Sequence, residues 1–169
     1  ARVLAVIAVE QQISGSRQIV LDLLERGLRW VDEFAESDPS GAVAVIDVLA
    51  PLAKDNGSLT ARREPLLEKA VAQEPGNAEV LSELALIYEG RKDLQKCTSL
   101  LAPHRDSLGD TEGARILGQI YAEQGDLEAS FVLLAPYAEG RLKQLRVAEQ
   151  AYGDAVKKTG DAALEQLKQ

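Results

Sequence analysis

Hydrophobic residues recur at helical spacing along most of the 169-residue chain. Leu23, Leu24 and Leu28 belong to a stripe that predicts a long amphipathic helix over residues 17–36. Residues 42–54 are apolar nearly all round, which predicts a deeply buried helix, and Ser40 is expected to cap it. Further helices are expected at residues 1–13, 59–73, 78–89, 93–101, 111–124, 126–137 and 141–159, with a last short one from residue 161.

A segment of twenty residues occurs twice, at 84–103 and 117–136, with an offset of 33 residues. The alignment places Tyr88 on Tyr121, and it superimposes the Leu-Leu-Ala-Pro that closes each copy. Weaker copies extend the pattern on both sides. Self-similarity at this period is typical of helical repeats that stack on one another.

The residues that recur resemble the tetratricopeptide repeat. In the first copy Leu84, Ala85, Tyr88, Cys97 and Leu101 occupy the large and small apolar positions where two helices cross, and the second copy has Leu117, Gly118, Tyr121, Ser130 and Leu134 there. Gly125 is expected to end the first helix in the left-handed conformation, whereas the first copy has Lys92 at that place. The resemblance implies an all-α, right-handed α-solenoid of antiparallel helix pairs with about eight or nine helices.

The resemblance also suggests a division of the chain. Residues 1–43 are expected to be N-terminal helices that pack on the solenoid as a degenerate repeat or cap. Residues 44–77, 78–110 and 111–145 are expected to be repeats, and 146–169 a partial, capping one. A Leu-Ala-Pro triplet at 49–51 matches the ends of the two clear copies, which would make 42–54 a second helix instead of a first helix. Both assignments stay open at this stage.

Composition narrows the function classes. Apolar content is 46% but aromatic content only 4%, which favours helix packing through alanine and leucine. A net charge of −8 argues against binding to nucleic acid or to an anionic membrane surface. No apolar run reaches the length of a membrane span. Residues 3–9 are the most apolar; we expect a buried helix edge there, the alternative being the remnant of a signal or anchor segment lying upstream.

Candidate chemistry is sparse. The sequence has no phosphate-binding loop, nucleophile elbow or paired catalytic carboxylates, so neither an enzyme nor a cofactor is expected. His104 is the single histidine, expected to be structural or solvated, and Cys97 the single cysteine, expected to be a buried small side chain. Trp30 is expected in the core, the alternative being a partner anchor. Asp106, Asp110 and Glu112 cluster without calcium-loop spacing and are interpreted as helix caps.

The remaining candidate site is a surface. By resemblance to the family, the first helix of each pair lines a concave groove that binds a partner peptide or helix, which implies a scaffold or adaptor. The outward positions are Glu79, Ser82, Leu86, Glu89, Glu112, Arg115, Gln119, Glu123, Gln150, Asp154 and Lys157. One alternative is an accessory domain of a larger bacterial envelope, secretion or assembly protein, and another is a small-ligand binder or enzyme. Self-association through an uncapped N-terminal helix pair stays open, and the sequence does not distinguish cytoplasm from periplasm.

Overall fold

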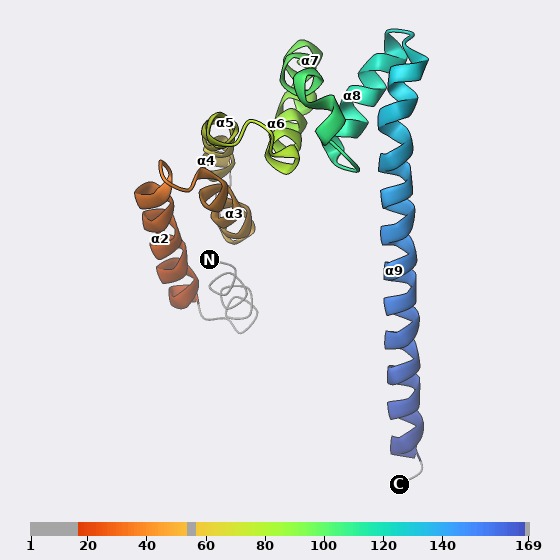
Figure 1. Ribbon diagram of the computed structural model, residues 1–169. Coiled ribbons are helices and arrows are strands. Elements are labelled where there is room, and N and C mark those ends of the chain that lie inside the picture. Colours follow the sequence, from red (N-terminus) through yellow and green to blue (C-terminus); the bar gives the residue numbers. More distant parts are fainter. Residues whose placement is uncertain (1–16, 54–56, 168–169) are drawn as a thin grey trace.

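The computed structural model describes residues 17–53 and 57–167, with side chains described for 20–53 and 57–158. Every regular element in these segments is helical (Figure 1). Only Arg62 separates α4 from α5, so we count these two segments as one helix. The described residues then hold seven α-helices, instead of the eight or nine expected. The elements are α2 (Arg17–Phe34), α3 (Pro39–Leu49), the 3-10 helix η1 (Ala50–Leu52), α4 (Gly57–Ala61), α5 (Arg63–Gln73), α6 (Ala78–Gly90), α7 (Leu94–Leu101), the 3-10 helix η2 (Ala102–Ser107), α8 (Glu112–Glu123) and α9 (Leu127–Leu167). The helix expected at residues 1–13 lies outside the described residues.

Short polar side chains start several helices. The carboxylate of Asp93 accepts a hydrogen bond from the backbone N–H of Lys96 at 3.1 Å, and Asp126 makes the equivalent bond at the start of α9. The prediction that Ser40 caps α3 is wrong. Asp38 does so instead, at 2.8 Å from the N–H of Gly41, because Pro39 directly after it takes the first helical position.

The two clear copies turn between their helices in the same way. Gly125 has φ +85°, which confirms the predicted left-handed turn, and Lys92 takes φ +60° at the equivalent place without being glycine. In each copy the N–H of the following aspartate donates to the carbonyl of the tyrosine, at 2.9 Å for both Tyr88 and Tyr121. The repeat therefore specifies this turn strongly enough to hold a lysine in an unfavourable backbone region.

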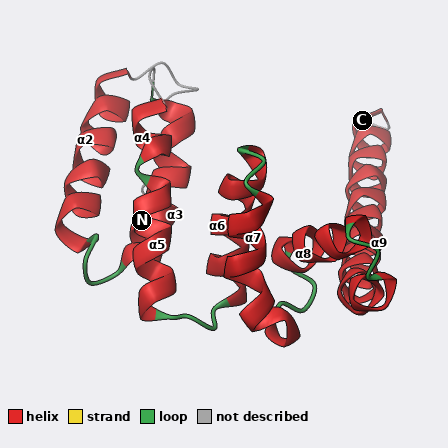
Figure 2. Ribbon diagram, turned by 90° about the horizontal axis from the view of Figure 1, so that it is seen from above, coloured by secondary structure: helices red, strands yellow, loops and turns green. Residues whose placement is uncertain are grey.

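Packing follows the order of the chain. Each helix contacts the next one, and α6 also packs against α8, so one apolar core continues from α2 to the first turns of α9 (Figures 1 and 2). Cys97 and Ala85 are fully buried where α7 crosses α6, and the Cys97 thiol lies 3.6 Å from the carbonyl oxygen of Ala85. Burial raises the pKa of this thiol, so the expected role of Cys97 as a small buried side chain is confirmed.

Aromatic side chains lie mostly where the repeat pattern places them. Tyr88 is buried, its hydroxyl donates to Glu68 at 3.2 Å, and burial together with that carboxylate raises the pKa of Tyr88 to about 12. Tyr121 is half-buried against the same core. Trp30 also packs against this core and stacks on Phe34 with ring centroids 4.9 Å apart, which confirms its core assignment.

The C-terminal segment departs from the expected pattern. Separate helices were predicted at 126–137, at 141–159 and from residue 161, but α9 runs unbroken over 41 residues and contains Pro136. Most residues after Pro136 are good helix formers, so nothing opposes continuation. Gly140 stays helical where it fits tightly against Asp110 of the loop before α8. The expected boundary between 111–145 and 146–169 therefore falls inside α9, whose later turns extend away from the other helices (Figure 1).

Candidate partner-binding face

Three of the four predicted groove residues on α6 line its outer side. Glu79 is exposed, Glu89 is half-buried, and Leu86 leaves 40% of its surface in water. Ser82 is different because it is buried. Its hydroxyl donates to the carbonyl of Ala78 at 2.6 Å and accepts from the N–H of Gly113 at 2.9 Å, which ties α6 to the start of α8. Ser82 is therefore a structural contact between neighbouring first helices and cannot meet a partner directly.

Arg115 is the centre of a hydrogen-bonded network on α8. Its two terminal nitrogens donate to both carboxylate oxygens of Glu89, at 2.9 and 2.8 Å. Its Nε donates to Glu112 at 2.6 Å, and one terminal nitrogen also reaches Gln119 at 2.7 Å. These hydrogen bonds, above all the two that Glu89 accepts, raise the pKa of the guanidinium. This bidentate ion pair joins α6 to α8, so the positive charge of Arg115 is largely neutralised by carboxylates of the protein itself.

Glu112 carries the same network on to α9. Its carboxylate accepts from the hydroxyl of Tyr137 at 2.8 Å and lies 3.5 Å from the guanidinium of Arg141. The hydrogen bond from Arg115, then the one from Tyr137, holds the pKa of Glu112 below its ordinary value. A series of ionic contacts and hydrogen bonds thus links α6, α8 and α9 next to the exposed residues of the candidate face.

The remaining predicted residues divide into two groups. Gln119 and Glu123 are exposed on α8. Gln119 accepts from Arg115, which also binds Glu89 of α6, whereas Glu123 lines an open hollow together with Leu94 of α7. Gln150, Asp154 and Lys157 are exposed on α9, and Gln150 lies thirteen residues beyond Tyr137, a distance of about 20 Å along a helix. The structure brings the α6 and α8 residues together and leaves those of α9 apart from them, because α9 does not fold back.

Sequence reasoning missed a second junction on the same side of the molecule. Arg63 of α5 lies between Asp47 of α3, with its Nε 2.6 Å from Oδ1, and Glu83 of α6 at 3.4 Å. The Nε proton does not point at Asp47, but a terminal nitrogen of Arg63 donates to Oδ2 of Asp47 at 3.3 Å and to the carboxylate of Glu83 at 3.4 Å. Burial, followed by the charge of Asp47, raises the pKa of Glu83. Helical spacing could have found Glu83, because it lies four residues after Glu79 on the same face.

The acidic residues interpreted as caps have other roles. Asp106 lies in η2 and pairs with its neighbour Arg105 at 3.2 Å, while Asp110 packs against Gly140. Glu112 belongs to the first turn of α8, and its carboxylate oxygens accept hydrogen bonds from Arg115 and Tyr137. The prediction is wrong because the cap position itself falls to Thr111, one residue after Asp110.

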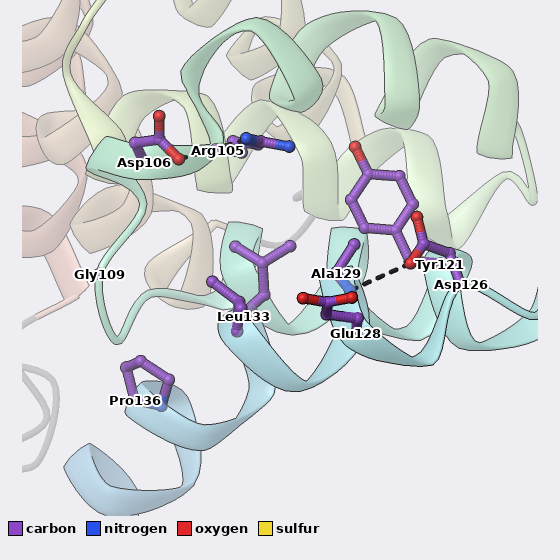
Figure 3. Close-up of a pocket in the computed structure, with 10 residues that line it drawn as sticks. Arg105, Asp106, Gly109, Tyr121, Asp126, Glu128, Ala129, Leu133 and Pro136 are labelled. Atoms are coloured by element: carbon purple, nitrogen blue, oxygen red, sulfur yellow. Dashed lines mark hydrogen bonds and ion pairs between the residues drawn. The ribbon is translucent and has the colours of Figure 1, made fainter.

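One open cavity of about 500 Å³ lies between η2 and the start of α9 (Figure 3). Arg105 and Asp106 at its rim pair with each other, and Asp126 accepts from the N–H of Ala129 at 3.1 Å. Arg105, Asp106 and Asp126 are thus already engaged in contacts with the protein itself. Elsewhere in the described residues, no group of histidine, cysteine and carboxylate side chains could hold a metal ion.

Comparisons with known proteins leave the face to be judged on its own geometry. No family model, no curated protein and no solved structure matches this chain. Within residues 17–53 and 57–167, no helix combines the length and the apolar content that crossing a bilayer requires.

Proposed function

We propose that the chain is a non-catalytic interaction scaffold, a right-handed helical solenoid similar to tetratricopeptide repeats, that binds a partner peptide or helix on the outer side of α6 and α8. The repeated residues at the helix crossings and the contact of α6 with α8 support this arrangement. A face built from two adjacent first helices offers a shallow surface several turns long, which suits an extended or helical segment.

The observation that carries the proposal is an exposed leucine surrounded by acidic and polar side chains. Leu86 is flanked along α6 by Glu79, Glu83 and Glu89, while Gln119 on α8 shares the guanidinium of Arg115 with Glu89. Glu89 and Glu112 neutralise Arg115, so the face remains acidic. A partner that fits it carries an apolar side chain for Leu86 and basic side chains next to it.

The test uses a pair of leucines with equal exposure. Leu86 on α6 and Leu94 on α7 each leave 40% of their surface in water, but Leu86 lies among the acidic side chains of α6, whereas Leu94 lines the hollow between α7 and α8 that Glu123 borders. Peptides are selected from a random display library on the wild-type chain, and their Kd is then measured for Leu86→Glu and Leu94→Glu. We expect Leu86→Glu to weaken binding at least tenfold and Leu94→Glu to leave it unchanged, because burying a new carboxylate at the contact is costly. Equal effects of both variants would contradict the assignment of the face.

The charge of the partner is tested on the same face. Glu79→Lys/Glu123→Lys reverses two exposed charges that make no ion pair in the described part of the chain. The selected peptides should be rich in lysine and arginine, bind this variant more weakly, and lose affinity for the wild type as salt is added. Selected peptides that are acidic, or whose Kd does not change with salt concentration, would contradict the prediction of a basic partner.

A further inference from the structure

An apolar stripe runs along α9 on a side that no described helix covers. Its large members are more than half exposed: Phe131 (71%), Leu142 (54%), Leu145 (55%), Tyr152 (74%) and Val156 (52%). With Ala135 and Ala138 they recur at alternating steps of three and four residues, interrupted once by Glu149. This is the spacing of a two-helix coiled-coil seam, sustained over about three and a half heptads.

The stripe is separate from the contact that α9 makes with α8. That contact uses Leu133, Leu134 and Tyr137, the last through Glu112 at the start of α8. At about 100° per residue, the stripe is centred roughly a quarter turn away from these side chains. Val147 is also 63% exposed, but it lies on nearly the opposite side of α9 from the stripe. The apolar exposure therefore includes a seam, interrupted at Glu149, that packing among the described residues leaves open.

The first copy of the repeat shows what normally covers this side. Leu101 of α7, the equivalent of Leu134, is fully buried, and it packs closely against Gly113 of α8. No helix of the described residues stands in the place of α8 after α9, so Leu134 stays partly exposed. Phe131, Ala135 and Ala138 continue the same uncovered side along α9. An occupant of the stripe would act as the next helix of the stack.

We propose that a second copy of this chain is that occupant, with the two α9 helices paired antiparallel. We propose the register in which Leu142 of each copy packs against Leu145 of the other, so that Phe131 packs against Val156. The bulky Tyr152 meets the small Ala135, which satisfies close packing. Glu149 meets Ala138, and a single charged residue in such a seam fixes the register at a cost in stability. The distal half of each α9 thus covers the proximal half of the other.

Charged residues beside the seam favour the antiparallel arrangement. Glu139 and Arg146 are both exposed and occupy the same flanking position in successive heptads. Antiparallel pairing places Glu139 of each copy next to Arg146 of the other, which gives two attractive contacts. Parallel pairing would instead place Arg146 next to Arg141 of the other copy, which is repulsive.

The first experiment measures the mass of the full chain by sedimentation equilibrium from low micromolar to about 100 µM. We expect a reversible dimer for the wild type, a monomer for Leu142→Asp/Leu145→Asp, and an unchanged dimer for Val147→Asp, the matched control on the other side of α9. Circular dichroism checks that each variant keeps its helices. A wild type that stays monomeric, or a Val147→Asp that dissociates equally, overturns the proposal and leaves the stripe to another protein.

The second experiment reads the direction of pairing. Arg146→Glu should weaken the dimer about tenfold, because it turns two attractive contacts into repulsive ones, and Glu139→Arg/Arg146→Glu should restore it. Parallel pairing predicts the reverse, a stronger dimer for Arg146→Glu alone. Oxidative cross-linking then fixes the register: Ala138→Cys should link to Glu149→Cys in a mixture, while neither variant links to itself. Self-linking of either variant overturns the antiparallel assignment.

Discussion

The two clear copies of the repeat, α6–α7 and α8–α9, begin alike and end differently. Both first helices finish with a residue in the left-handed region, and both second helices start at an aspartate cap. Within the shared Leu-Ala-Pro, the first copy leaves the α-helix at Ala102 for η2, whereas the second continues through Pro136 to Leu167. The earlier triplet at 49–51 behaves like the first copy, since α3 also gives way to a 3-10 helix at its alanine.

The cause lies beyond the proline. In the first copy Leu108 is fully buried and Gly109 takes φ +57°, which turns the chain towards α8. The second copy has Arg141 and Leu142 at these positions. Arg141 is exposed where Leu108 is buried, and leucine does not readily adopt the positive φ of Gly109. The comparison teaches that the repeated residues decide where helices cross, while residues outside the repeated segment decide where a helix ends.

The largest expected difference between the copies concerns one pair of leucines. Leu101→Ala should lower the free energy of unfolding by about 3 kcal/mol, because the side chain is fully buried between α6 and α8. Leu134→Ala should cost only about 1 kcal/mol, since Leu134 is partly exposed and no helix of the described segments follows to cover it. Urea unfolding at low protein concentration measures both values. Equal losses would show that a further helix of the same chain covers Leu134.

A smaller, reciprocal effect is expected at the turns. Lys92→Gly should stabilise the protein by about 0.5–1 kcal/mol, because it relieves the strain of φ +60°. Gly125→Lys should destabilise it by about 1–2 kcal/mol at φ +85°. Thermal melts of the two single variants and of the double exchange test this. A Lys92→Gly variant that is no more stable than wild type, or a Gly125→Lys variant that is no less stable, would contradict the strain assigned to these turns.

The smallest expected effect is a difference in pH dependence between two glutamates. The folded-state pKa of Glu112 is lowered, so its contribution to stability is present above the unfolded value of about 4.3 and is lost as the pH falls through the folded value. The pKa of Glu83 is raised, so its contribution is present at low pH and is lost as the pH rises through the folded value.

Replacement by glutamine should therefore act in opposite senses. Relative to wild type, Glu112→Gln should lose stability at pH 7, and the loss should shrink below about pH 4. The stability of Glu83→Gln, relative to that of the wild type, should be higher at pH 7 than at low pH. Melting temperatures between about pH 3 and pH 7 give both curves. Parallel curves for the two variants would mean that one of the two pKa directions is misassigned.

Much of the fold could be predicted because its signals are local. The crossing residues Ala85 and Cys97, the tyrosine positions and the turn at Gly125 were predicted from the internal repeat and its resemblance to a known helical repeat, and the structure agrees with each. The course of α9 could not be predicted in this way. Gly153 and Gly160 lie in the segment 146–169, which was expected to be a partial repeat, yet both are inside the helix, because an isolated glycine weakens a helix without ending it.

The candidate face was predicted only in outline. Helical spacing identifies the outward positions Glu79, Leu86 and Gln119, but it cannot show which neighbour a polar side chain will meet. The burial of Ser82 depends on the approach of Gly113, and the pairing of Arg115 depends on the approach of Glu89. Both contacts join residues more than twenty-five positions apart, so they follow from the stacking of α6 on α8 and not from either helix alone.

The length of α9 makes it a lever arm. Contacts with α8 hold its first turns, and residues 141–167 extend roughly 40 Å beyond them at 1.5 Å per residue. A tilt of about 5° at the α8 junction would move the far tip by about 3.5 Å over that length. Small shifts among Glu89, Arg115 and Glu112, such as those caused by a ligand on the acidic face, would therefore be amplified into a displacement of the distant tip large enough for fluorescence energy transfer to follow.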